Sequence, residues 1–304
     1  MKNKKLTVTI GVPAYNEELN IQKLLTSILS QKETNFKIAE IILISDRSTD
    51  KTVEKAFEVK DKRLNIIRNP KRMGNTQNIN KICRMAEGDV VVLFDADVIL
   101  ANKMTLSNLV QPFIIDQNVG LTSGLSWPRE ASTFIEKAIY VTFKAYIEMR
   151  KDIKKGNSIY SCVGRSMALS KEFSKLVDIP KTIYASDAYL YLLCIKNNFN
   201  FQFVPSAKII FNSPATLRDH IKQNTRFVGS LENVYPIFGE LAKKEFYVPK
   251  LHLYKYLLSE FVKMPMHAAV IFIVNLYTKY LSSRKKGGPL WSTIKSTKGV
   301  NIHE

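Results

Sequence analysis

Two carboxylates separated by a single residue follow an apolar run: Asp95 and Asp97 come directly after Val90–Phe94. A pair at this spacing can share a hard divalent cation, or one member can bind the cation while the other accepts a hydroxyl group. Mg²⁺ in proteins typically uses one or two carboxylates together with phosphate oxygens of a substrate. The pair therefore predicts a metal site that bridges to a diphosphate, and a simple turn is the alternative.

Two further acidic residues occupy positions where they could bind or activate a substrate. Asp46 follows the apolar run Ile41–Ile44, and its carboxylate could accept an N–H of a base or a ribose hydroxyl. Asp187 follows Ser186 at a predicted helix start, where it could take a proton from an attacking hydroxyl. A helix-capping or helix-start charge is the alternative for both aspartates.

Basic and amide side chains supply candidate partners for phosphate groups. Arg68 precedes the pair Lys71-Arg72 in a predicted loop, where guanidinium groups could contact phosphates or simply face solvent. Gln223 and Arg226 fall within one helical turn and share a face. We interpret them as a clamp for a pyrophosphate or an acceptor, with an exposed helix as the alternative.

The elements that must position these residues alternate in the first 125 residues. Apolar strands are predicted at Thr7–Val12, Ile41–Ile44, Leu64–Ile67 and Val90–Phe94. Amphipathic helices separate them, with starts predicted at Asn16, at Ser48 or Thr49, and at Asn75 or Thr76. Nearly continuous apolar strands between helices indicate an α/β fold with a mostly parallel sheet covered on both faces. Since such sheets bind ligands at the carboxyl ends of their strands, we expect the polar clusters to meet there.

The second half has a different rhythm and ends in a helical appendage. An aromatic-rich amphipathic stretch, 246–262, precedes an uncharged segment, 264–278, and a basic tail. Aromatic residues alternating with lysines are typical of a helix at a membrane surface, and packing on the catalytic domain is the alternative. At ~1.5 Å per residue the uncharged segment covers only ~22 Å of a ~30 Å hydrocarbon core, so we expect no full span.

Composition narrows the class of protein. The 304 residues carry 45 Lys and Arg against 27 Asp and Glu, a formal charge of +18, which excludes neither enzymes nor binding proteins but indicates an anionic partner or a lysine-rich proteome. Hydrophobic residues make up 45%, which excludes a disordered chain. Cys83, Cys162 and Cys194 show no CxxC spacing, so neither a disulfide framework nor a cysteine zinc site is expected.

Taken in order, these segments resemble family 2 glycosyltransferases with a GT-A fold. The segments that carry the resemblance are Val12-Pro13-Ala14-Tyr15-Asn16-Glu17, Ser45-Asp46-Arg47-Ser48-Thr49-Asp50, 74–80, Glu87-Gly88-Asp89, Phe94-Asp95-Ala96-Asp97, Ser186-Asp187 and Pro205-Ser206-Ala207. The segment 223–227 is similar to the Q-x-x-R-W motif of membrane-associated members. The resemblance implies a catalytic domain over 1–232, divided at 125 into nucleotide-sugar and acceptor parts, and a basic helical region over 233–304.

The resemblance also implies roles for the candidate residues. Donor binding falls to Pro13, Tyr15, Glu17, Asp46, Arg68 and Asp95; the metal, Mg²⁺ or Mn²⁺, to Asp97 and Asp95; the catalytic base to Asp187; and the diphosphate or acceptor to Gln223 and Arg226. Arg47, Ser186 and Phe227 depart from the usual pattern, where a small residue, Glu and Trp are common. The last two departures argue against processive synthesis.

The implied reaction is inverting, metal-dependent transfer of a sugar from a nucleotide diphosphate sugar, with UDP favoured, to a lipid-linked or cell-envelope acceptor. The expected location is the cytoplasm, peripheral on the cytoplasmic face of the membrane, with an anionic membrane surface as partner and no nucleic acid. A sugar-nucleotide nucleotidylyltransferase is the alternative enzyme, although strand one lacks its glycine-rich basic loop. A basic, non-enzymatic nucleic-acid- or membrane-binding protein is the alternative of another class.

Overall fold

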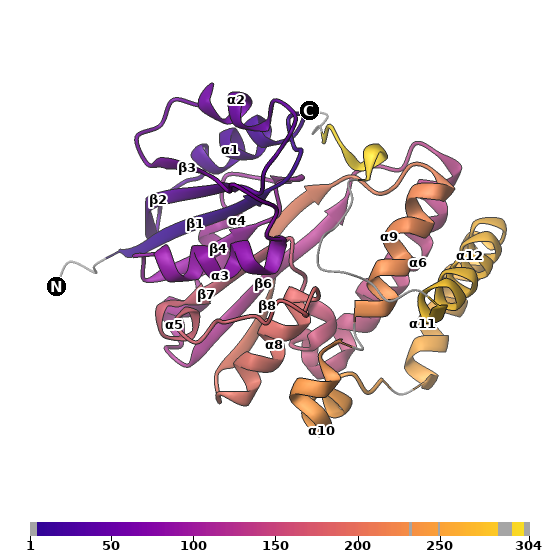
Figure 1. The fold of residues 1–304 in the computed structure, drawn as a ribbon. Helices are drawn as coiled ribbons and strands as arrows, with labels where there is room; N and C mark the ends of the chain where they lie inside the picture. The colour runs from indigo at the N-terminus through magenta and orange to yellow at the C-terminus, as the bar shows by residue number, and fades with distance from the viewer. Residues whose placement is uncertain (1–4, 231–232, 249, 285–293, 301–304) are drawn as a thin grey trace.

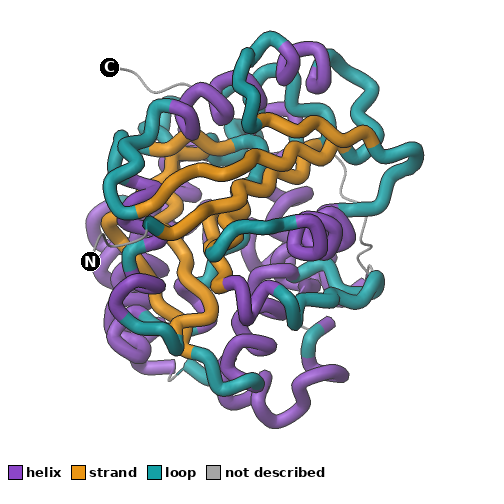
Figure 2. Tube along the Cα trace, turned by 90° about the vertical axis from the view of Figure 1, so that its left-hand side faces the viewer, coloured by secondary structure: helices purple, strands orange, loops and turns teal. Residues whose placement is uncertain are grey.

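One eight-stranded sheet organises the computed structural model, which describes residues 5–230, 233–248, 250–284 and 294–300. Its strand order is β3-β2-β1-β4-β7-β6-β8-β5. Figure 1 shows helices on both faces of this sheet, and Figure 2 shows its twist. The predicted α/β fold with a helical C-terminal region is confirmed, although the sheet is mixed beyond β4.

The first four strands pair in parallel with one another, as the apolar runs predict. They are β1 (Leu6–Ala14), β2 (Phe36–Ser45), β3 (Leu64–Arg68) and β4 (Val90–Phe94). The helices between them are α1 (Ile21–Leu29), α2 (Thr52–Phe57) and α3 (Asn75–Met85). In β4, Val92 and Phe94 enter one core and Val91 and Leu93 enter the other. Burial on both faces explains why this strand carries no alternating polar residues.

Two helix starts differ from the prediction. Asn16 does not cap α1: its φ is 55°, its side chain bonds Thr49, and the helix begins four residues after the expected point, behind Asn20. The second helix begins at Thr52 instead of Ser48 or Thr49. Both starts move because these side chains tie the loops after β1 and β2 to each other instead of to their own helices.

The second half of the chain completes the sheet in mixed directions. Its strands are β5 (Val98–Leu100), β6 (Val119–Pro128), β7 (Ser166–Ser170) and β8 (Asn200–Phe211). Its helices are α4 (Thr105–Val110), α5 (Pro112–Ile115), α6 (Phe134–Asp152), α7 (Lys171–Ser174), α8 (Ser186–Lys196) and α9 (Leu217–Ser230). Strand β7 lies antiparallel between β4 and β6, so the segment before β7 meets the end of β4.

Three helices follow: α10 (Tyr235–Glu245), α11 (Lys250–Lys263) and α12 (Pro265–Arg284). Helices α11 and α12 pack on α6 and α9, away from the sheet (Figure 1). The uncharged segment 264–278 forms most of α12 and buries one face against its neighbours. No described helix is long and apolar enough to cross a bilayer. After α12, the turn η4 (Lys295–Thr297) lies back beside the N-terminal half (Figure 1).

Candidate active site

A pocket opens where β1, β2 and β4 end, as the strand-end clusters predict. It encloses about 1350 Å³ of space, including a part open to solvent. The predicted site residues that line it are Pro13, Tyr15, Glu17, Asp46, Asp95, Asp97, Asp187 and Gln223. The sheet topology thus brings together residues that lie up to 210 positions apart in the chain.

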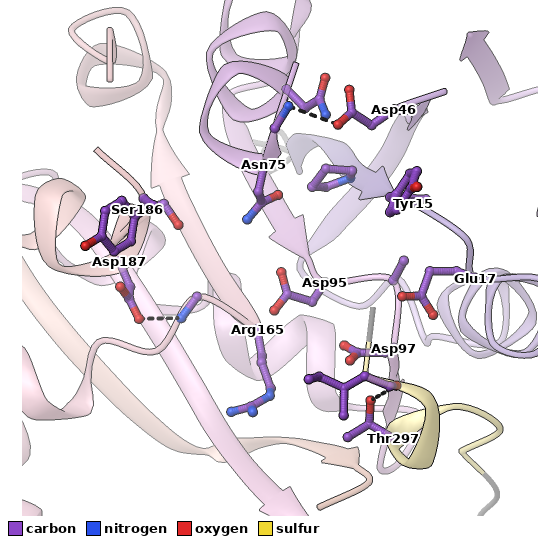
Figure 3. A pocket seen from close by; sticks show the side chains of 18 of the residues that line it. Tyr15, Glu17, Asp46, Asn75, Asp95, Asp97, Arg165, Ser186, Asp187 and Thr297 are labelled. Carbon is purple, nitrogen blue, oxygen red and sulfur yellow. Dashed lines mark hydrogen bonds between the residues drawn. The ribbon is translucent and has the colours of Figure 1, made fainter. Parts of the chain in front are cut away.

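Asp95 and Asp97 lie at the centre of the pocket floor (Figure 3). The N–H of Asp95 donates to the carbonyl of Arg165 at 3.2 Å, which ties the end of β4 to the start of β7. Burial, and next the Asp97 carboxylate, raise the pKa of Asp95 to about 7. Two crowded carboxylates of this kind are hard oxygen ligands, and a divalent cation would relieve their repulsion. The pair therefore fits Mg²⁺ or Mn²⁺ that takes its other ligands from diphosphate and water, and the described residues form no cluster of three or more ligating side chains.

Glu17 faces the same side of the pocket (Figure 3). Burial, followed by the charge of Asp97, raises the pKa of Glu17 to about 7. Its carboxylate already has two partners, since one oxygen pairs with the Lys298 ammonium and the other accepts the Asn20 amide N–H at 2.8 Å. Both partners are groups of the protein itself, whereas the resemblance implies that Glu17 binds the nucleoside. That role remains a prediction.

Asp187 approaches from α8, across the pocket from Glu17 (Figure 3). The main-chain N–H of Ala188 donates to Oδ1 at 2.9 Å, and that of Gly164 donates to Oδ2 at 3.4 Å. Burial raises the pKa of Asp187 despite these bonds. A carboxylate that is fixed in place and more basic than usual is suited to accept a proton.

Asp46 holds the loop that leads into α3. Its carboxylate accepts the N–H groups of Met73 at 2.7 Å and Gly74 at 2.9 Å. Gly74 has a φ of 87°, a conformation that favours glycine at this helix start. Arg72 lies 3.9 Å from Asp46, and its guanidinium stacks 3.6 Å from the centre of the Tyr15 ring. The loop thereby places a cation at the expected nucleoside end of the pocket.

Arg68 is not among the residues that line the pocket. It ends β3 at the edge of the sheet, is exposed, and its guanidinium lies 5.8 Å from the centre of the Phe57 ring. Arg72, four residues further on, lines the pocket in its place. The Lys71-Arg72 pair was the sequence signal for this residue.

Helix α9 brings Gln223 and Phe227 to the pocket, and the clamp of Gln223 and Arg226 stays a prediction. The side chain of Arg226 lies outside the described residues. Arg165 also lines the pocket, with its guanidinium 3.9 Å from the centre of the Phe211 ring. No sequence motif predicted Arg165, because it reaches the pocket through the antiparallel pairing of β7 with β4.

Three residues near the C-terminus, Ile294, Thr297 and Lys298, also line the pocket, and Figure 3 labels Thr297. The sequence offered no signal for them, because residues 294–300 have neither periodicity nor a motif and their contacts span about 280 positions. A lysine in a basic tail is indistinguishable from its neighbours until the fold brings it to the pocket.

Comparisons with known proteins agree with this geometry. The model of the family Glycosyl transferase family 2 matches residues 9–176. An uncharacterized glycosyltransferase of Haemophilus influenzae is 31% identical over 119 residues, 38% of this chain and 46% of that protein. One of Methanocaldococcus jannaschii is 26% identical, covering 69% and 72%. The dolichol-phosphate mannosyltransferase of Pyrococcus furiosus is 24% identical, covering 58% and 56%. The chain thus matches about half the length of the first and third of these relatives.

Solved structures share the fold at low identity. A mannosyltransferase from Pyrobaculum calidifontis, in complex with GDP-Man and Mn²⁺, has a TM-score of 0.61 at 18% identity, covering 92% of this chain and 74% of that one. The glucosyl-3-phosphoglycerate synthase of Mycobacterium tuberculosis, with Mn²⁺, UDP and phosphoglyceric acid, has a TM-score of 0.53 at 18% identity, covering 77% and 79%. With the fold, the strand-end pocket and a family match over more than half its length, the chain belongs to glycosyl transferase family 2.

Proposed function

We propose that this protein transfers a sugar from a nucleotide diphosphate sugar to a hydroxyl group of an acceptor, with inversion at the anomeric carbon. The observation that carries the proposal is the placement of Asp95 and Asp97 on the pocket floor with Asp187 across from Glu17 (Figure 3). This arrangement leaves room between a diphosphate-binding side and a proton acceptor. Family membership and nucleotide complexes of proteins with the same fold support it.

The donor lies along the carboxyl ends of the strands in this proposal. Pro13, Tyr15 and Asp46 bound the nucleoside end, with Arg72 beside them. Asp97 and Asp95, which line the pocket, would hold Mg²⁺ or Mn²⁺. When bound there, the cation offsets the negative charge that grows on the departing diphosphate.

The acceptor enters from the side of α8 and α9. Asp187 takes the proton from its hydroxyl group, and the oxygen attacks the anomeric carbon from the face opposite the diphosphate. The bond to the diphosphate breaks as the new glycosidic bond forms, so the configuration inverts. Gln223, with Arg226 as a further candidate, contacts the acceptor or the diphosphate.

The substrate classes are proposals drawn from relatives. We favour UDP as the nucleotide, and the neighbours in complex with GDP-Man and with UDP make both worth testing. We favour a lipid-linked or cell-envelope glycan acceptor. A relative from Escherichia coli, 31% identical over 100 residues, is a UDP-Glc:alpha-D-GlcNAc-diphosphoundecaprenol beta-1,3-glucosyltransferase.

A donor panel tests the reaction. Each nucleotide sugar is incubated with lipid-linked and soluble glycan acceptors, with Mn²⁺, Mg²⁺ or EDTA, and both nucleoside diphosphate and pyrophosphate are measured. Metal-dependent release of a nucleoside diphosphate together with a product of inverted configuration is the expected result. A parallel incubation with a nucleoside triphosphate and a sugar 1-phosphate tests the alternative enzyme. Pyrophosphate release in that incubation, without nucleoside diphosphate release from any nucleotide sugar, would instead identify a nucleotidylyltransferase.

We also propose that the outer face of α12, with α11 beside it, rests on an anionic membrane surface. The buried residues Ala268, Ile271 and Thr278 face α6 and α9, and apolar side chains face outward. Those exposed by half or more are Met266, Phe272, Ile273, Leu276, Tyr277 and Tyr280. An apolar patch of this extent beside Lys263, Lys279 and Arg284 suits acyl chains and anionic headgroups together.

Vesicle sedimentation tests the membrane contact. Phe272→Ser with Ile273→Ser should reduce binding to vesicles containing phosphatidylglycerol, because it removes two outward apolar groups that are 59% and 65% exposed. The matched control is Ile115→Ser on α5, which is 75% exposed and lies on another side of the molecule (Figure 1). Equal binding by the double variant and the control would contradict the proposal.

The domain limits and the location remain proposals of the same kind. We place the catalytic domain at 1–232, with 1–125 for the donor and 126–232 for the acceptor, and the basic helical region at 233–304. Residues 294–300 add a wall to the catalytic pocket from that second region. We propose that the enzyme works at the cytoplasmic face of the membrane.

A further inference from the structure

Residues 294–300, which we call the C-terminal strap, close one side of the pocket. Ile294, Thr297 and Lys298 line it together with Asp97, and Figure 3 labels Thr297 and Asp97 in the pocket. The family match ends at residue 176, so the strap lies outside the matched part of the chain. The family match therefore says nothing about the strap, and its role follows from its own contacts.

Hydrogen bonds attach the strap at both ends, and the bond from the Val300 N–H is buried. At one end, Asn20 Oδ1 accepts the N–H groups of Gly299 and Val300, both at 2.9 Å. At the other end, Asp219 Oδ2 accepts the N–H of Ser296 at 3.1 Å and its hydroxyl at 2.6 Å. Asn20 is 2% exposed and Val300 is fully buried. Because hydrogen bonds fix it at both ends, the strap is a structural part of the pocket wall.

The strap directs one cation into the pocket. The Lys298 side chain is 16% exposed, and its ammonium pairs with Oε1 of Glu17. The other oxygen of Glu17 accepts from Asn20, the same residue that anchors the strap. One hydrogen-bonded network thus fixes both the backbone of the strap and the position of its lysine.

The charges around the pocket give this lysine a role. Among the described residues that line it, five carboxylates stand against three cations: Arg72, Arg165 and Lys298. Arg72 stacks on the Tyr15 ring near Asp46, and Arg165 stacks on the Phe211 ring. Lys298 is the cation on the side of Glu17 and Asp97, where the charge of Asp97 also acts on Glu17. A diphosphate placed at this side needs positive partners beyond a single divalent ion.

We propose that Lys298 binds the diphosphate of the donor and that the strap thereby completes the donor site. In the free protein Glu17 holds the Lys298 ammonium in place. When the donor binds, this ammonium pairs with a phosphate oxygen. The inference rests on the proposed function, since it assumes a nucleoside diphosphate in this pocket. It assigns Glu17 the task of positioning Lys298.

Calorimetric titration of UDP, GDP, UMP and GMP tests the proposal, with Mn²⁺ and again with EDTA. The variants are Lys298→Met, which keeps the aliphatic stem, and Lys298→Arg, which keeps the charge. Loss of one charge-assisted contact should weaken nucleoside diphosphate binding by about 10- to 100-fold and monophosphate binding by much less. Arg should restore most of the affinity. Lys175→Met, which removes an exposed charge at the end of α7 outside the pocket, should leave binding unchanged.

Each contrary result has a distinct meaning. If the wild-type protein binds neither UDP nor GDP, the proposed function fails. If it binds one of them and Lys298→Met binds it equally well, the inference about Lys298 fails. If diphosphate and monophosphate affinities fall alike while amide exchange of 294–300 speeds up in the free variant, Lys298 only fastens the strap, and the diphosphate contact is overturned.

Discussion

Replacing Asp187 with Asn tests the proton acceptor while changing the shape of the site very little. An asparagine keeps one oxygen that can accept from Ala188 or Gly164, but its amide cannot take a proton. Loss of general base catalysis typically costs about 10²- to 10⁴-fold in rate, which corresponds to about 3–5 kcal/mol in the activation barrier. Because Asp187 lies across the pocket from Glu17, donor affinity should change by less than about 3-fold, which is under about 1 kcal/mol.

The assay is initial-rate release of nucleoside diphosphate, together with calorimetric donor binding. Since burial raises the pKa of Asp187, the wild-type rate should rise as pH passes upward through that raised pKa and the carboxylate ionises. The variant should lose this rise. Asp178→Asn, which removes an exposed carboxylate outside the pocket, is the matched control. Near-normal turnover by Asp187→Asn, or an unchanged pH profile, would remove Asp187 as the base.

Three substitutions test how the fold supports the site. Gly124→Ala should lower the free energy of unfolding by about 1–3 kcal/mol in thermal denaturation, because its Cβ would lie 2.3 Å from the carbonyl oxygen of Ala207; an unchanged Tm would refute this crowding. Glu136→Ala should cost about 1 kcal/mol in urea unfolding, since this carboxylate completes the capping box of α6. Asp61, whose bond to Arg63 lowers its pKa to about 2, stabilises the fold fully above its unfolded pKa of ~3.9, and this contribution is lost as pH falls through about 2. Asp61→Asn should therefore cost on the order of 0.5 kcal/mol at pH 7 and much less at pH 2, and an equal cost at both would contradict the pairing.

Apolar strand runs made the first half of the fold predictable. Val90–Phe94 is buried on both faces, so its composition alone identifies a central strand. Because parallel strands end at the same edge of a sheet, Asp95, Asp97 and Asp46 could be predicted to lie at one edge without knowledge of strand order. These local patterns carry enough information because each strand and its following turn are contiguous in sequence.

Long-range contacts set the features that the sequence did not predict. Arg68 could be distinguished from Arg72 only by knowing that β3 forms the sheet edge and that the following loop folds back toward Asp46. Lys298 reaches Glu17 through a strap whose position depends on Asn20 and Asp219. Pairings across more than 75 residues leave no periodic trace in the chain.

Titration of UDP and GDP into the wild-type protein and Asp97→Asn most directly tests whether the strand-end pocket is a metal–diphosphate site. One of the two nucleotides should bind in the presence of Mn²⁺. Its affinity should fall at least about 10-fold in EDTA and by a similar factor in the variant, because the same metal contact is lost in both cases. An affinity that changes neither with EDTA nor with the substitution would contradict the central claim, as would no binding of either nucleotide.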